Sequence, residues 1–229
     1  MKQDYSTHLL QPLNMAMRFR VLKNMLLEDE EKNKEMSGTL LLLECMSSGE
    51  RIEVKREQDY FQLNHTIPDE KQTVKSVQLH TQQELVSEIE REMWSLYYRD
   101  TKTPPYDFVP LRIASNWEVH YNTFINVDPT SLDENDEDAW MSFTLDFIQL
   151  HYDREDGTIF TIDMGWLPEF NPNGHYCIVL IINYGWEAPA KDVEVRKPEE
   201  VVQAVAEIMD EVASGKYDEW KPEQGQEEI

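Results

Sequence analysis

Two stretches in the second half of the chain carry the residue types that could support acid–base chemistry. His120 and His151 fall on adjacent predicted strands, and with Asp146 and Asp163, on polar positions of neighbouring strands, they could line one sheet face. Carboxylates beside a histidine can exchange protons with a substrate. Because these residues alternate with apolar ones, as on a strand with one wet face, we interpret them as solvated surface. We therefore assign no catalytic residue, and an acid–base enzyme using His120, His151 or Asp163 stays an alternative.

His175 and Cys177 are the two residues whose spacing could suit a metal ion. Residues two apart share one face of a strand, so both side chains could reach one ion. No further ligand stands at a suitable spacing in the sequence. We therefore expect no metal site and no cofactor. The second cysteine, Cys45, lies far away in another apolar run, which favours two buried free thiols over a disulfide.

The segment 128–138 concentrates negative charge and is predicted to be a loop. It lacks the glycine at the sixth position, and the flanking helices, of an EF-hand calcium loop. A cluster of carboxylates of this kind steers a basic protein towards it, although a merely solvated charge run is the simpler reading. We predict that this loop contacts a basic partner through Asp128, Asp133, Glu134, Asp136, Glu137 and Asp138.

Trp166 follows a glycine at the end of a predicted strand, and Glu169 and Phe170 come soon after it. A tryptophan in such a place most often closes a core. An aromatic residue beside acidic residues is also how interface hot spots are built. We therefore add Trp166, Glu169 and Phe170 to the expected partner-binding residues.

The charge of the chain limits the classes of partner. The 229 residues carry 45 acidic and 21 basic side chains, for a formal net charge of −24. Residues 1–110 hold 14 basic and 19 acidic side chains, whereas residues 111–229 hold 7 and 26. Such a field repels nucleic acid and anionic lipid and attracts cationic surfaces. We expect a basic protein partner, no direct binding of nucleic acid and no membrane contact. Because residues 1–4 begin no apolar signal segment, we expect a cytoplasmic location.

The first half is predicted to be a short helix and strand over 5–27, a charged loop over 28–35, and an antiparallel meander over 39–79. Thr81 and Glu84 form a capping box, and apolar residues at helical spacing follow, which predicts a helix over 81–98. Pro104 and Pro105 lie in the expected boundary between the halves, at about 99–112.

The second half is predicted to contain a strand over 117–127, a long strand over 139–152 with a bulge near 147–149, and strands over 158–166 and 175–183. Met141, Phe143, Leu145 and Phe147 share one parity of the long strand. Pro198 at a first helical position and Gly215 after the last apolar residue predict a helix over 198–214. The fold class is α+β, with mainly antiparallel sheet and two amphipathic helices. The halves 1–110 and 111–217 suggest two ββββα units, with a flexible acidic tail over 218–229, although one continuous fold is the alternative.

The segment from Phe160 to Pro168, FTIDMGWLP, is followed by Asn171 to Tyr176, NPNGHY. These residues resemble the strand–"GW-P"–loop–strand pattern of some bacterial immunity proteins. The resemblance covers residues 158–214, including the closing helix. Such proteins are cytoplasmic antitoxins paired with polymorphic or contact-dependent inhibition toxins. The resemblance implies that this chain binds and occludes a toxin domain, often a basic nuclease, and it carries over no catalytic residue.

Our first hypothesis is therefore a non-catalytic, immunity-like protein that neutralises a basic partner by occlusion and charge complementarity. The second is an acidic nucleic-acid mimic that fills the DNA groove of a host or defence enzyme. Mimicry requires carboxylates spaced like phosphates along a helix or a sheet edge. The acidic residues here gather in loops and in the tail, which favours the first hypothesis.

Overall fold

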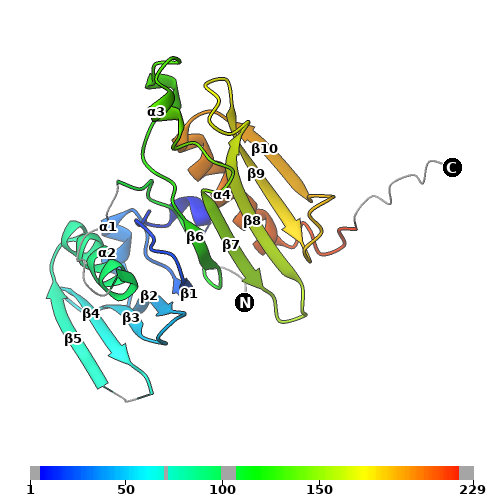
Figure 1. Ribbon diagram of the computed structural model, residues 1–229. Coiled ribbons are helices and arrows are strands. Elements are labelled where there is room, and N and C mark those ends of the chain that lie inside the picture. Colours follow the sequence, from blue (N-terminus) through cyan, green and yellow to red (C-terminus); the bar gives the residue numbers. More distant parts are fainter. Residues whose placement is uncertain (1–5, 70–71, 99–106, 222–229) are drawn as a thin grey trace.

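The computed structural model describes residues 6–69, 72–98 and 107–221, and it has the α+β fold class predicted from the sequence (Figure 1). The described residues form one antiparallel sheet of ten strands. Its strands are β1 (Phe19–Asn24), β2 (Gly38–Cys45), β3 (Arg51–Arg56), β4 (Phe61–Ile67), β5 (Gln72–Leu79), β6 (Glu118–Asn122), β7 (Ile148–Asp153), β8 (Ile159–Leu167), β9 (His175–Ile182) and β10 (Lys191–Val195). The helices are α1 (Glu30–Glu35), α2 (Gln82–Tyr98), α3 (Glu137–Trp140) and α4 (Pro198–Ser214), with 3-10 helices η1 (Thr7–Leu9) and η2 (Pro129–Ser131).

The two halves of the chain repeat one order of elements. Each has a strand, a short helix, four more strands and a helix of 17 residues. The sheet order is β10-β9-β8-β7-β6-β1-β2-β3-β4-β5, so the first strands of the halves pair antiparallel at its centre. Each half thus contributes five strands to a shared sheet, where the sequence suggested four.

The core is built from one parity of the strands. Phe19 pairs with Val119, which pairs with Leu150, and that row continues through Ile162 to Leu180. All five side chains are buried, and they belong to one apolar cluster that extends through both halves. Because successive strand residues point to opposite faces, the intervening residues lie on the other side of the sheet.

The two long helices confirm the sequence prediction, and their ends have the expected caps. At the start of α2, the Thr81 amide donates to the Glu84 carboxylate at 3.1 Å, and the Glu84 amide donates to the Thr81 hydroxyl at 3.2 Å. Gly215 ends α4 in the left-handed conformation at φ 83°, which costs glycine little. Helix α2 packs against β2 to β5, whereas α4 packs against β9, β10 and η1.

Three local predictions are wrong. The expected loop 28–35 contains helix α1, because the Asp29 side chain caps the amides of Glu31 and Lys32. Within the expected strand 117–127, regular strand is confined to β6, and Ile125 forms an isolated bridge with Phe108. The bulge lies in β6 between Val119 and Tyr121, rather than near 147–149.

Two parts of the prediction fall partly outside the described residues. The expected boundary at 99–112 includes 99–106, and the expected tail at 218–229 includes 222–229; neither of these segments is described. The described start of the tail is packed: Asp218 pairs with Arg154, and Trp220 lies against the core. None of the helices within the described ranges is long and apolar enough to cross a membrane.

Candidate protein-binding surface

The acidic loop is an ordered structure in which three carboxylates accept local hydrogen bonds. Asp128 accepts from the amide of Thr130 at 2.8 Å and caps η2. Asp133 accepts from the amide of Asn135 at 2.9 Å, and Asp136 caps α3 through the amide of Ala139 at 3.2 Å. These bonds stabilise the ionised form: the Thr130 hydroxyl and amide lower the pKa of Asp128, and the Asn135 amide lowers that of Asp133. These three carboxylates therefore stabilise the conformation of the loop.

The other three carboxylates of the loop are available to a partner. Glu134, Glu137 and Asp138 are exposed, and none makes a hydrogen bond or ion pair with another described side chain. They lie on and beside α3, which Figure 1 shows projecting at one end of the C-terminal half, well away from α2. Their charge faces solvent uncompensated, which is the condition for electrostatic steering of a cationic protein.

An aromatic cluster joins this loop to the segment that follows β8. The Trp140 ring lies 5.0 Å from Phe143 and 5.9 Å from Trp166, between ring centroids. The Trp140 indole N–H donates to the Asp133 carbonyl at 2.9 Å, which fixes the acidic loop above the cluster. Two segments that the sequence nominated separately, 128–138 and 166–170, are therefore held side by side.

Trp166 itself is not a surface residue, which corrects the expectation that it anchors a partner. Its side chain is 0% exposed, and its ring packs against that of Tyr176 with the ring centroids 4.9 Å apart. Its indole N–H donates to the carbonyl of Asn171 at 3.0 Å, and the Arg196 guanidinium lies over its ring. A side chain without exposed surface cannot insert into a partner, so Trp166 organises the surface from beneath. Phe170 remains exposed, as an anchor requires.

The predicted long strand over 139–152 is wrong, and its replacement supplies the apolar part of the surface. Residues 137–140 form α3, and paired strand begins only at Ile148. In the connecting segment, the Thr144 carbonyl accepts from the Trp166 amide at 2.7 Å, and the Leu145 amide donates to Glu169 at 3.0 Å. Phe143 and Phe147 point into the core, whereas Met141 and Leu145 point outward.

We define the tip surface by its exposed residues from both segments. Its apolar members are between 39% and 60% exposed, and the hydrogen bond from the Phe170 amide to the Phe143 carbonyl, at 2.8 Å, holds the two segments together. The same two segments carry the exposed carboxylates of Glu137 and Asp138 on α3, and Glu169, whose carboxylate accepts from the Leu145 amide. Exposed apolar side chains together with charged ones are typical of protein interfaces. The tip surface consists of the exposed residues Glu134, Glu137, Asp138, Met141, Leu145, Leu167 and Phe170, together with the half-buried Glu169.

The residues of the enzyme alternative come together on the sheet face opposite the core. The rings of His120 and His151 stack with centroids 4.0 Å apart, and His120 Nε2 lies 3.0 Å from Glu118. Burial lowers the pKa of His151, as does the neighbouring His120. Burial also raises the pKa of Asp163, which bonds Gln149 at 3.1 Å. His151 is paired in register with Glu118, whereas His120 lies at the bulge of β6. Glu118 belongs to a row of charged residues that are paired across neighbouring strands.

That row alternates in charge across the centre of the sheet. Arg51 pairs in register with Glu44, Glu44 with Arg20, and Arg20 with Glu118. Arg51 Nη2 lies 2.8 Å from Glu44, and Arg20 forms an ion pair with Glu118. Opposite charges placed directly across a strand pair stabilise sheet pairing, so this row has a structural role at the junction of the halves.

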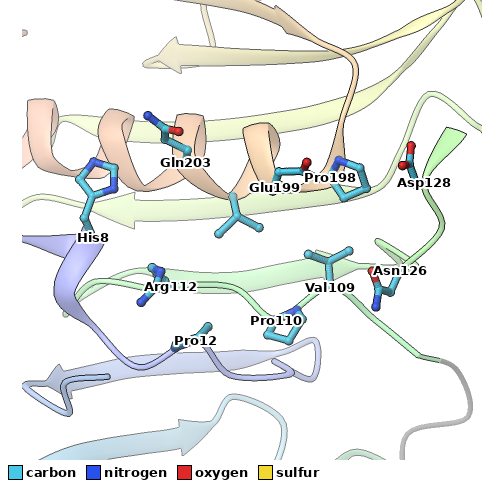
Figure 2. A pocket seen from close by; sticks show the side chains of 11 residues that line it. His8, Pro12, Val109, Pro110, Arg112, Asn126, Asp128, Pro198, Glu199 and Gln203 are labelled. Atoms are coloured by element: carbon cyan, nitrogen blue, oxygen red, sulfur yellow. The ribbon is translucent and has the colours of Figure 1, made fainter. Parts of the chain in front are cut away.

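A groove of about 560 Å³ runs between α4 and the extended segment 109–112, beside the acidic loop (Figure 2). It shares only Asp128 with the expected partner-binding residues, and the two stacked histidines lie outside it. His175 and Cys177 lie elsewhere, beside the carboxylates of Glu194 and Asp192. Among the described residues, no group of three His, Cys, Asp or Glu side chains is placed to hold a metal ion.

Comparison with known proteins adds no relative to this description. No protein-family model, no curated protein and no solved structure gives a significant match to the chain.

Proposed function

We propose that this chain is a non-catalytic binding protein that neutralises a basic protein partner by covering it with the tip surface, in the manner of an immunity protein that occludes a toxin domain. The observation that carries the proposal is the meeting of exposed apolar side chains and unpaired carboxylates on one fixed surface. Met141 and Phe170 supply apolar contacts, and Glu134, Glu137 and Asp138 supply steering charge.

The distribution of charge supports a cationic partner. Most of the net negative charge belongs to residues 111–229, which include the tip surface. Rim carboxylates raise the rate of association with a cationic protein, and desolvated apolar residues slow dissociation. The acidic side chains of the tip lie in a loop and a helix of four residues, which favours a compact protein interface over a phosphate-like row along an edge.

The test uses two variants with equal net charge. The tip variant carries Glu134→Gln, Glu137→Gln and Asp138→Asn, which leaves the structural carboxylates Asp128, Asp133 and Asp136 unchanged. The control variant carries Glu155→Gln, Glu187→Gln and Glu207→Gln, three exposed carboxylates outside the tip.

Each protein serves as bait in extracts of the cells that produce it, and the affinity of the captured partner is then measured at several salt concentrations. We expect a stoichiometric cationic protein on the wild type and on the control. Its association with the tip variant should be about tenfold slower and less sensitive to salt. Equal rates and equal salt dependence for both variants would refute the role of the tip.

A further inference from the structure

We propose that the groove beside α4 binds the two charged ends of a short peptide of two or three residues. The inference is independent of the proposed function, because none of the tip residues lines the groove. Its volume of about 560 Å³ falls within the range of small-ligand sites in proteins. It lies where segments of both halves meet, a common position for such sites.

The groove separates opposite charges along its length. Figure 2 shows His8, Gln203 and Arg112 at one end, and Glu199, Asp128 and Asn126 at the other. The carboxylates of Asp128 and Glu199 are exposed and offer acceptors to an ammonium group. A ligand with one positive and one negative end therefore matches the groove in a single orientation.

The basic end is held in place before any ligand arrives. The Arg112 guanidinium donates to the Leu10 carbonyl and, at 2.8 Å, to the carboxylate of Glu28. A guanidinium has five N–H donors, so donors remain for a carboxylate. A fixed guanidinium loses little conformational freedom on binding.

The middle of the groove suits a short extended chain with apolar side chains. Val109, Pro110 and Val202 line it between the charged ends. Glu199 and Gln203 stand one turn apart on α4, or about 6 Å along the helix axis. Two extended residues span about 7 Å, so a dipeptide or tripeptide brings its ammonium and carboxylate groups to opposite ends.

The intact protein is titrated with the tripeptide Ala-Leu-Ala at millimolar concentrations. Calorimetry measures the binding, and the chemical shifts of the protein's amides in NMR spectra locate it. N-acetylated and C-amidated forms of the same peptide test each end. We expect saturable binding of the free tripeptide, with about tenfold weaker binding after either modification, the loss of one charge-assisted contact. The shifted amides should lie in residues 109–112, 126–128 and 198–203.

A variant pair assigns the ammonium group to its end of the groove. In the double variant Asp128→Asn, Glu199→Gln, N-acetylation of the tripeptide should not change its affinity, whereas C-amidation should still weaken binding. The control, Glu155→Gln with Glu187→Gln, should behave as wild type. The proposal is overturned if the free tripeptide does not bind saturably, if the modified peptides bind equally well, or if both variants respond alike to acetylation.

Discussion

Gly165 is the position at which one added methyl group should disconnect the tip surface from the sheet. A Cβ atom at residue 165 would overlap the carbonyl oxygen of Leu145 and lie 2.8 Å from its Cα. The connecting segment would have to move away from β8. Three hydrogen bonds depend on that contact: the Trp166 amide to Thr144 at 2.7 Å, the Phe147 amide to Met164 at 2.8 Å, and the Leu145 amide to Glu169 at 3.0 Å.

A hydrogen bond of this kind contributes about 0.5–1.5 kcal/mol, so Gly165→Ala should lower the free energy of unfolding by about 2–4 kcal/mol. Urea unfolding followed by tryptophan fluorescence measures the loss. The matched control is Gly185→Ala, whose Cβ would lie 3.2 Å from the Ile182 carbonyl, and it should cost less than about 1 kcal/mol. If the two variants lose equal stability, the close approach of Leu145 does not hold the tip.

Two further substitutions test buried polar groups. His65 lies 2.7 Å from Glu50 and 3.3 Å from Glu92, whose hydrogen bond raises the pKa of His65, while the pKa of Glu92 is lowered to about 2. The imidazolium therefore stabilises the fold below the unfolded-state pKa of about 6.5, and this contribution disappears as pH rises through the higher folded-state pKa. Between about pH 6 and pH 9, the free energy of unfolding of the wild type should fall, and this fall should be absent in His65→Gln. Parallel plots of unfolding free energy against pH for the two proteins would contradict this assignment. Asn33 is fully buried; its side chain accepts from the Leu27 amide and donates to the Leu27 carbonyl and to Gln82. Asn33→Leu should therefore lower the free energy of unfolding in urea by about 2–4 kcal/mol. A loss below about 1 kcal/mol would refute this structural role of Asn33.

Elements with local signals at both ends could be predicted from the sequence. Helix α2 begins at a capping box, α4 has proline at its start, and Gly215 closes it. These signals act within a few residues, so they do not depend on the rest of the fold. The antiparallel meander was predictable for the same reason, because each strand is followed by turn residues.

The region of the tip could not be predicted correctly, because its pattern imitates a strand. Met141, Phe143, Leu145 and Phe147 alternate with polar residues, yet only Phe143 and Phe147 are buried. Their positions are set by packing against distant Trp166, which periodicity along the chain does not reveal. The Asp136 cap of α3 was a signal that the sequence did contain.

The candidate surface was predicted in part. Glu134, Glu137, Asp138 and Phe170 are exposed, as a partner-binding residue must be, whereas Trp166 is buried. A glycine–tryptophan pair fits both a core and an interface, and contacts with Trp140, Phe143 and Tyr176, distant in sequence, place Trp166 in the core. Leu167 could not be nominated, because its exposure depends on where β8 ends against the connecting segment.

Hydrogen–deuterium exchange, measured on the chain alone and with its captured partner, shows where the partner covers the chain. If the tip surface covers the partner, protection appears in residues 133–146 and 167–170, and amide exchange in the strands around His120 and His151 is unchanged. Protection confined to those strands, with the tip exchanging as in the free protein, would contradict this role of the tip surface.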